Sequence, residues 1–155
     1  MYTREQVSKI KQEFWTTFGQ YMAPQYGADG QKVNWINYKT GYRGLYFRME
    51  ADNKQAYIGI VLQQKDADLR TLFWEQLEEL RNPLHGMLEE EWQWEPLAYN
   101  EYGQAYSHAS TTLRPANIYQ REGWAEIITF FKQRILLLDE FWSVAQYHFE
   151  PLKYL

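Results

Sequence analysis

The sequence predicts an α+β domain in which three helices cover a mostly antiparallel sheet. Three neighbouring segments between residues 33 and 63 have the length and the bounding turn residues of consecutive β-strands. A helical pattern precedes them, and two longer helical patterns with a second pair of strands follow. Together these observations predict the element order αβββαββα in a single domain over residues 1–155.

The first helix is predicted to begin at Thr3, which has the spacing of a capping box with Gln6. Apolar residues then recur at steps of three and four, namely Val7, Ile10, Phe14 and Phe18. Pro24 marks the end of this helix, because proline lacks the amide hydrogen that a helix interior needs. A glycine-containing loop leads from there to the first predicted strand, at 33–39.

The second predicted strand, 45–50, alternates strictly between apolar and polar residues, which indicates a strand with one buried and one accessible face. The apolar face carries Leu45, Phe47 and Met49. The accessible face carries Tyr46, Arg48 and Glu50. The third predicted strand, 55–63, is rich in apolar residues on both faces, so we expect cover on both sides.

The second half of the chain contains two helices and another pair of strands. Asp66 or Asp68 is expected to cap the second helix, where a carboxylate also suits the positive end of the helix dipole. Pro83 and Gly86 predict a kink or break about two-thirds along this helix. The remaining predicted elements are two strands and a final helix: 92–97, 105–113 and about 121–149.

The final helix carries more apolar surface than one packing face needs. A second apolar stripe, rotated by roughly 120° from the main one, contains Phe130, Leu137 and Phe141. Two covers for this stripe remain open: another helix of the same domain, or a second copy of the chain in a homodimer.

The composition excludes several kinds of site. There is no cysteine, so disulfides, thiolate metal ligands and cysteine nucleophiles are excluded. The three histidines are far apart and lack the spacing of metal ligands, so we expect no metal and no cofactor. The formal net charge of −4 argues against non-specific binding of polyanions, although one basic face is compatible with it.

Aromatic residues make up 18% of the chain, and tyrosine and tryptophan are favoured both in cores and at partner surfaces. The polar amino terminus predicts no signal peptide, and the apolar runs are shorter than the roughly 20 residues that span a bilayer. We therefore expect a cytoplasmic protein with no membrane contact.

The predicted order of helix, three strands, helix and strand is similar to the core of the PD-(D/E)xK nucleases, which hold Mg²⁺ with carboxylates beside a lysine. The matching positions here are Asp52, with Glu50 as a substitute, and the pair Gln63 and Lys65 at the end of the third strand. A neutral Gln63 offers Mg²⁺ one carbonyl oxygen in place of a charged carboxylate, which weakens metal binding. A divergent or inactive nuclease that uses Mg²⁺ is therefore the alternative interpretation.

The accessible face of the second strand is the stronger candidate site. It presents Tyr46, Arg48 and Glu50, with Tyr57 of the neighbouring strand across from them. An arginine among aromatic rings can hold a phosphate or carboxylate and stack on a planar group. The competing interpretation is a cross-strand Arg–Glu pair with solvent-facing tyrosines.

Several segments resemble an uncharacterised bacterial family of domains of unknown function: 14–22 (FWTTFGQYM), 35–41 (WINYKTG), 45–49 (LYFRM), Glu91-Trp92 and Trp124. The resemblance covers nearly the whole chain. Members stand alone or form the carboxy-terminal domain beside restriction-nuclease-like regions, which implies a link with nucleic-acid processing but assigns no catalytic residue. We therefore expect a non-enzymatic accessory protein whose partner is a protein or a nucleic acid.

Overall fold

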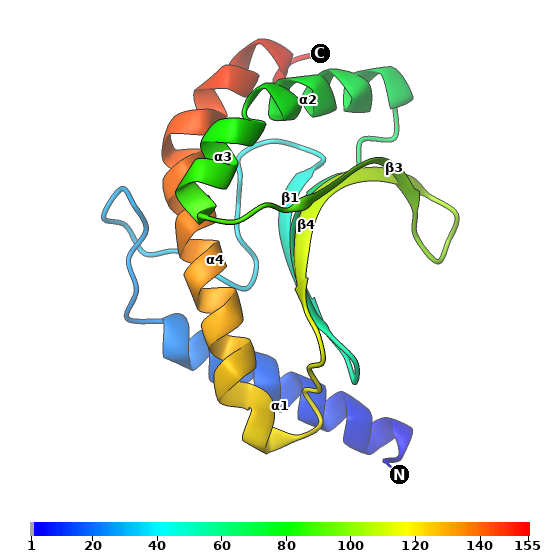
Figure 1. Cartoon of the computed structure of the whole chain (residues 1–155), viewed down its shortest axis with the longest axis vertical. Coiled ribbons are helices and arrows are strands. Elements are labelled where there is room, and N and C mark those ends of the chain that lie inside the picture. Colours follow the sequence, from blue (N-terminus) through cyan, green and yellow to red (C-terminus); the bar gives the residue numbers. More distant parts are fainter. Residues whose placement is uncertain (1) are drawn as a thin grey trace.

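Four antiparallel strands form one curved sheet in the spatial order β1-β2-β4-β3 (Figure 1). The computed structural model describes residues 2–155. The strands are β1 (Leu45–Ala51), β2 (Ala56–Leu62), β3 (Gln93–Tyr99) and β4 (Ala105–Leu113). The predicted α+β class with a mostly antiparallel sheet is confirmed.

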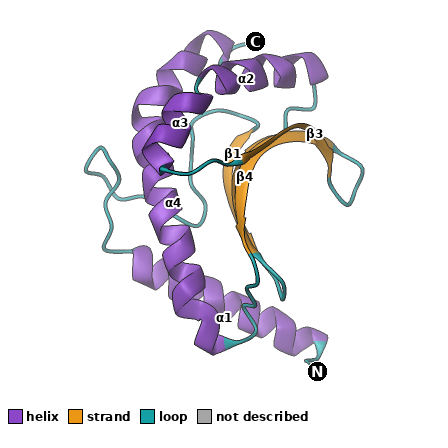
Figure 2. Cartoon of the chain, viewed as in Figure 1, coloured by secondary structure: helices purple, strands orange, loops and turns teal. Residues whose placement is uncertain are grey.

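Helices lie on one side and at both ends of the sheet. The α-helices are α1 (Arg4–Met22), α2 (Ala67–Glu79), α3 (Arg81–Leu88) and α4 (Trp124–Ala145). Two 3₁₀ segments flank α4: η1 (Arg121–Gly123) and η2 (Gln146–Leu152). Figure 2 shows α4 running along one face of the sheet, while the opposite face curves away from it and is open. Within residues 2–155, no helix combines the length and the apolar character needed to cross a bilayer.

The helix starts follow the predicted capping chemistry. The Gln6 amide donates to Thr3 Oγ1 at 3.1 Å, and the Thr3 amide donates to Gln6 Oε1 at 2.8 Å, which completes the capping box of α1. The Asp66 carboxylate accepts from the amides of Asp68 and Leu69 and caps α2.

The break in the second predicted helix lies earlier than Pro83. It falls at Leu80, between α2 and α3, so residues 2–155 contain four α-helices where three were predicted. Pro83 then occupies the first turn of α3, where a missing amide hydrogen costs no intrahelical hydrogen bond.

The strand predicted at 33–39 is wrong, because this segment is part of a long loop between α1 and β1. A side chain takes the place of a strand partner for one backbone amide of this segment: Asn34 Oδ1 accepts a hydrogen bond from the Asn37 amide at 3.1 Å. Trp35 is buried and donates to the Gln25 carbonyl oxygen, while Tyr38 stacks on Phe47 with ring centroids 4.9 Å apart. Tertiary packing of these two rings overrides the strand propensity, and the three-stranded meander becomes the β1–β2 hairpin.

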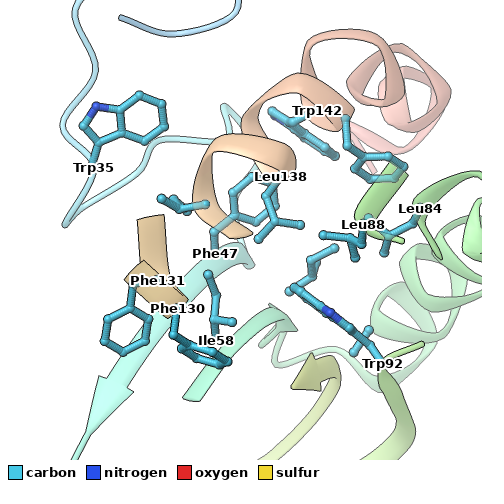
Figure 3. Close-up of a cluster of buried hydrophobic side chains, with 14 of the residues drawn as sticks. Trp35, Phe47, Ile58, Leu84, Leu88, Trp92, Phe130, Phe131, Leu138 and Trp142 are labelled. Atoms are coloured by element: carbon cyan, nitrogen blue, oxygen red, sulfur yellow. The ribbon is translucent and has the colours of Figure 1, made fainter. Parts of the chain in front are cut away.

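The core lies between the sheet and the helices, and Figure 3 shows part of it. Leu45 and Phe47 point into it from β1 with 1% and 5% exposure, as the alternation predicts. From α4, Phe131 packs edge-on against Phe14 and Phe18 of α1.

The second apolar stripe of α4 is covered by the chain itself. Phe130 and Phe141 are buried, and Leu137 packs against the same core. Arg134 lies over the Phe130 ring at 4.3 Å and forms a two-pronged ion pair with Glu90, at 2.8 and 2.9 Å. Because these side chains pack against other residues of the same chain, the stripe needs no second copy to cover it.

The long loop is anchored to α4 by the buried carboxylate of Asp139. Its Oδ1 accepts from the Tyr38 hydroxyl at 2.5 Å and its Oδ2 from the Ala28 amide at 2.6 Å. Burial and this carboxylate raise the pKa of Tyr38 above its ordinary value, so the hydroxyl stays a donor.

Asp139→Asn should lower the free energy of unfolding by about 1–3 kcal/mol, because an amide offers one acceptor where the site uses two and lacks the charge. Urea denaturation measures this loss. Glu140→Gln, at the exposed neighbouring position, is the matched control and should stay within about 0.5 kcal/mol of the wild type. Equal losses for the two variants would contradict the anchoring role.

His85 gives the fold a defined response to acid. Its Nε2 accepts from the Trp92 amide at 3.2 Å and from Trp94 Nε1 at 2.9 Å, so this nitrogen carries no proton. Burial, followed by the charge of Arg81, lowers the pKa of His85. The folded state therefore favours the neutral imidazole, and its contribution to stability declines as the pH falls below the unfolded-state value of about 6.5.

Between about pH 7 and about pH 5, the wild type should lose more unfolding free energy than His85→Gln, which has no titrating group at this position. Urea denaturation at the two pH values measures the difference. His148→Gln changes an exposed histidine and should follow the wild type. Parallel pH curves for wild type and His85→Gln would contradict this assignment.

Candidate binding site on the concave sheet face

Figure 2 shows the sheet face that is turned away from α4. This face forms the floor of a polar groove with a volume of about 750 Å³, which we call the concave groove. Lys11 and Trp15 of α1 line one end, and Tyr102 of the β3–β4 turn lines another part of the rim. The floor is made by alternate side chains of the four strands. One register row across the floor joins Arg48, Gly59, Ser110 and Gln93.

Arg48 places a positively charged guanidinium in the groove, and no carboxylate pairs with it in residues 2–155. Its guanidinium lies 4.3 Å from the centre of the Tyr46 ring, and Nη2 donates to Gln63 Oε1 at 2.8 Å. Its Nε is buried and has no hydrogen-bond partner. Among residues 2–155, no carboxylate oxygen lies within 4.0 Å of its guanidinium nitrogens, so the cross-strand Arg–Glu pair does not form. The arrangement leaves a positive charge that can receive an anionic group.

Tyr57, His108 and Glu95 form a chain of hydrogen bonds across β2, β4 and β3. The Tyr57 hydroxyl lies 2.7 Å from His108 Nδ1, and His108 Nε2 lies 3.0 Å from Glu95 Oε1. An ionised carboxylate only accepts, so it assigns the proton of a neutral His108 to Nε2 and leaves Nδ1 to accept from Tyr57. Burial raises the pKa of Tyr57 above its ordinary value, which keeps this hydroxyl protonated.

Gly59 makes room for this chain. A Cβ atom at this position would lie 2.5 Å from the Tyr57 hydroxyl and 3.0 Å from Ser110 Cβ. The ring of Tyr57 can therefore lie along its own strand and reach His108 only because residue 59 lacks a side chain.

The structure brings together all four residues of the predicted binding face. Tyr46, Arg48 and Glu50 project from β1 on the groove side, and Glu50 and Tyr57 are register partners. Sequence reasoning missed His108 and Glu95. The signal was present as polar alternation along β4, at Tyr106, His108, Ser110 and Thr112.

The structure does not bring together the residues of the nuclease interpretation. Asp52 lies in the β1–β2 turn, where its Oδ1 accepts from the amides of Lys54 and Gln55. Gln63 and the exposed Lys65 follow the opposite end of the hairpin, where the Gln63 amide donates to the Gly44 carbonyl oxygen. The two ends are separated by about six register steps, or roughly 20 Å, which is too far for one metal ion to bridge.

Two other features of that interpretation are missing. The strand at 33–39, on which the shared element order depended, is a loop, and every strand pair of the sheet is antiparallel. Glu50, the substitute acid, is paired with Tyr57 near the turn end of the hairpin. Within residues 2–155, no group of three or more His, Asp or Glu side chains is placed to hold a metal ion.

Gly59→Ala should displace the Tyr57 hydroxyl and cost about 1–3 kcal/mol of unfolding free energy, because the added methyl overlaps it. The matched control is Gly86→Ala in α3, where an added Cβ meets no atom within 4 Å and alanine is the better helix former. Thermal and urea unfolding measure both variants. A Gly59→Ala protein as stable as the wild type would contradict the close approach.

A family model described as a domain of unknown function, DUF4268, matches residues 10–146. No curated protein and no solved structure gives a significant match to the chain. The match covers most of the 155 residues and includes all four strands of the groove. The chain is therefore a member of the DUF4268 family.

Proposed function

We propose that this chain is an accessory binding protein of the cytoplasm, linked with nucleic-acid processing, whose concave groove holds one phosphate of a short nucleic-acid segment. The observation that carries the proposal is that no carboxylate pairs with Arg48 within residues 2–155. Its guanidinium is held in place by Gln63 and by the Tyr46 ring, so little freedom is lost when an anion binds.

The charges around Arg48 favour a short ligand. Lys11 and Arg48 are the cationic side chains of the groove. Four acidic side chains line it as well: Glu50, Asp52, Glu95 and Glu101. A long polyanion would bring further phosphates against these carboxylates, whereas a single phosphate beside Arg48 avoids them.

Aromatic rings of the groove supply surfaces for a planar group. Tyr57 and Tyr106 lie on the sheet floor, and Trp15 and Tyr102 line the rim. Stacking on such rings is how proteins bind unpaired bases, and it tolerates different base sequences. The combination of one cation and several rings supports a single-stranded or terminal segment over a duplex.

Arg48→Ala should weaken binding of a short single-stranded oligonucleotide with a terminal phosphate by about 10- to 100-fold, since a charge-assisted hydrogen bond is lost. Fluorescence anisotropy with a label at the other end measures the affinity. The matched control, Arg43→Ala, removes an exposed arginine that does not line the groove, and should change affinity by less than about twofold.

The salt dependence provides a second check. With one or two phosphates engaged, the slope of log affinity against log salt should be about −1. Oligonucleotide binding that Arg48→Ala leaves unchanged would contradict the proposal. Arg48-dependent binding of acidic peptides, with no binding of the oligonucleotide, would identify a protein partner instead.

A further inference from the structure

We propose that the concave groove is also a reactive site, in which the Tyr57 oxygen attacks a phosphate diester and His108 takes up the hydroxyl proton. The inference rests on the proposed function, because it needs the phosphate beside Arg48. Glu95 acts as a positioning residue that holds the His108 ring and supports its positive charge after proton transfer.

The connectivity of the three side chains is that of an activated nucleophile. A hydroxyl donates to a ring nitrogen, and the other ring nitrogen donates to a carboxylate. His108 is 7% exposed and both its nitrogens are engaged, so it cannot activate a free water molecule in this arrangement. The only oxygen it can activate directly is that of Tyr57.

Tyr57 needs this base. Its burial favours the neutral hydroxyl, so little tyrosinate forms without a proton acceptor in contact with it. A base that takes the proton only as the new bond forms avoids a free buried anion. Glu95 Oε1 lies 3.0 Å from His108 Nε2 and so holds the ring with Nδ1 turned toward Tyr57.

Arg48 selects the class of electrophile. It is the register partner of Gly59, and Tyr57 lies two residues away on the same groove face. A carboxylic ester is neutral and becomes negative only in its transition state, whereas a phosphate diester is already an anion that a guanidinium binds in the ground state. A diester carries one negative charge, so the four acidic side chains of the groove repel it less than they would repel a doubly charged monoester.

The proposed step is a transesterification. A bond forms between the Tyr57 oxygen and phosphorus, and the bond between phosphorus and the leaving oxygen breaks. The Tyr57 proton passes to His108 Nδ1, and the leaving group departs as an alcohol or phenol after protonation by the imidazolium or by solvent. No electrons are gained or lost, and the product is a phosphodiester of Tyr57.

The test incubates the full-length protein with bis(4-nitrophenyl) phosphate. We expect release of one equivalent of 4-nitrophenolate and a protein mass increased by one nitrophenyl phosphate group, which peptide mapping places on Tyr57. Tyr57→Phe should abolish the adduct. The matched control, Tyr147→Phe in η2, removes an exposed hydroxyl that does not line the groove, and this variant should form the adduct at the wild-type rate.

The roles of the other two residues have separate readouts. His108→Gln should slow adduct formation about 100-fold or more, as expected for a lost general base. Glu95→Gln should slow adduct formation, whereas Glu95→Asp, which keeps a carboxylate acceptor for His108 Nε2, should retain most of the rate. The charged and titratable groups that share the groove with His108 are the following: Tyr57, Tyr102, Tyr106, Glu50, Asp52, Glu95, Glu101, Lys11 and Arg48.

Calorimetry with diphenyl phosphate, whose leaving group is poor, measures diester binding apart from reaction. Arg48-dependent binding without an adduct on Tyr57 would overturn the reactive site and leave the binding function intact. Absence of both binding and adduct would overturn both. An adduct that persists in Tyr57→Phe would show labelling elsewhere and would also overturn the reactive site.

Discussion

The packing of α4 against one face of the sheet is the contact on which the rest of the structure depends. Phe131, Ile135 and Leu138 are fully buried there, and burial of such side chains is the main favourable term in folding. A strand has a side-chain period of two, so burying one face sends every second side chain to the other. The strand side chains that pack against α4 are apolar, and the alternate side chains point to the other face and line the groove.

The same packing fixes the positions of the side chains in the groove, because it fixes the register of the strands. A slip of one residue in β1 would move Arg48 to the core side, and a slip in β4 would move His108 there. Burial of the apolar face therefore also fixes the register of the open face. The open face can then carry polar groups that would be costly in a core. Examples are the guanidinium of Arg48, whose Nε has no hydrogen-bond partner, and the linked side chains of Tyr57 and His108. Rigid strands hold polar groups more closely than loops do, which suits a binding or reactive site.

Departures from the predicted fold share one physical origin. The segment 33–39 has apolar residues at strand spacing, but Trp35 and Tyr38 find better partners beneath the loop and on Phe47 than a sheet edge offers. The sequence left the cover of the second α4 stripe open between the same chain and a second copy. In the structure Arg134, paired with Glu90, lies over Phe130 of this stripe. In both cases a distant contact outweighs a local pattern.

Local chemistry alone was enough to determine the capped starts of α1 and α2, the inward and outward faces of β1, and the α+β class, because each depends on residues a few positions apart. The predicted binding face of Tyr46, Arg48, Glu50 and Tyr57 came from the same short-range alternation. Only the tertiary structure placed β4 beside β2 and so joined Tyr57 to His108, which are 51 positions apart. Strand order in a sheet depends on how the whole chain buries its apolar faces, and no local spacing encodes it.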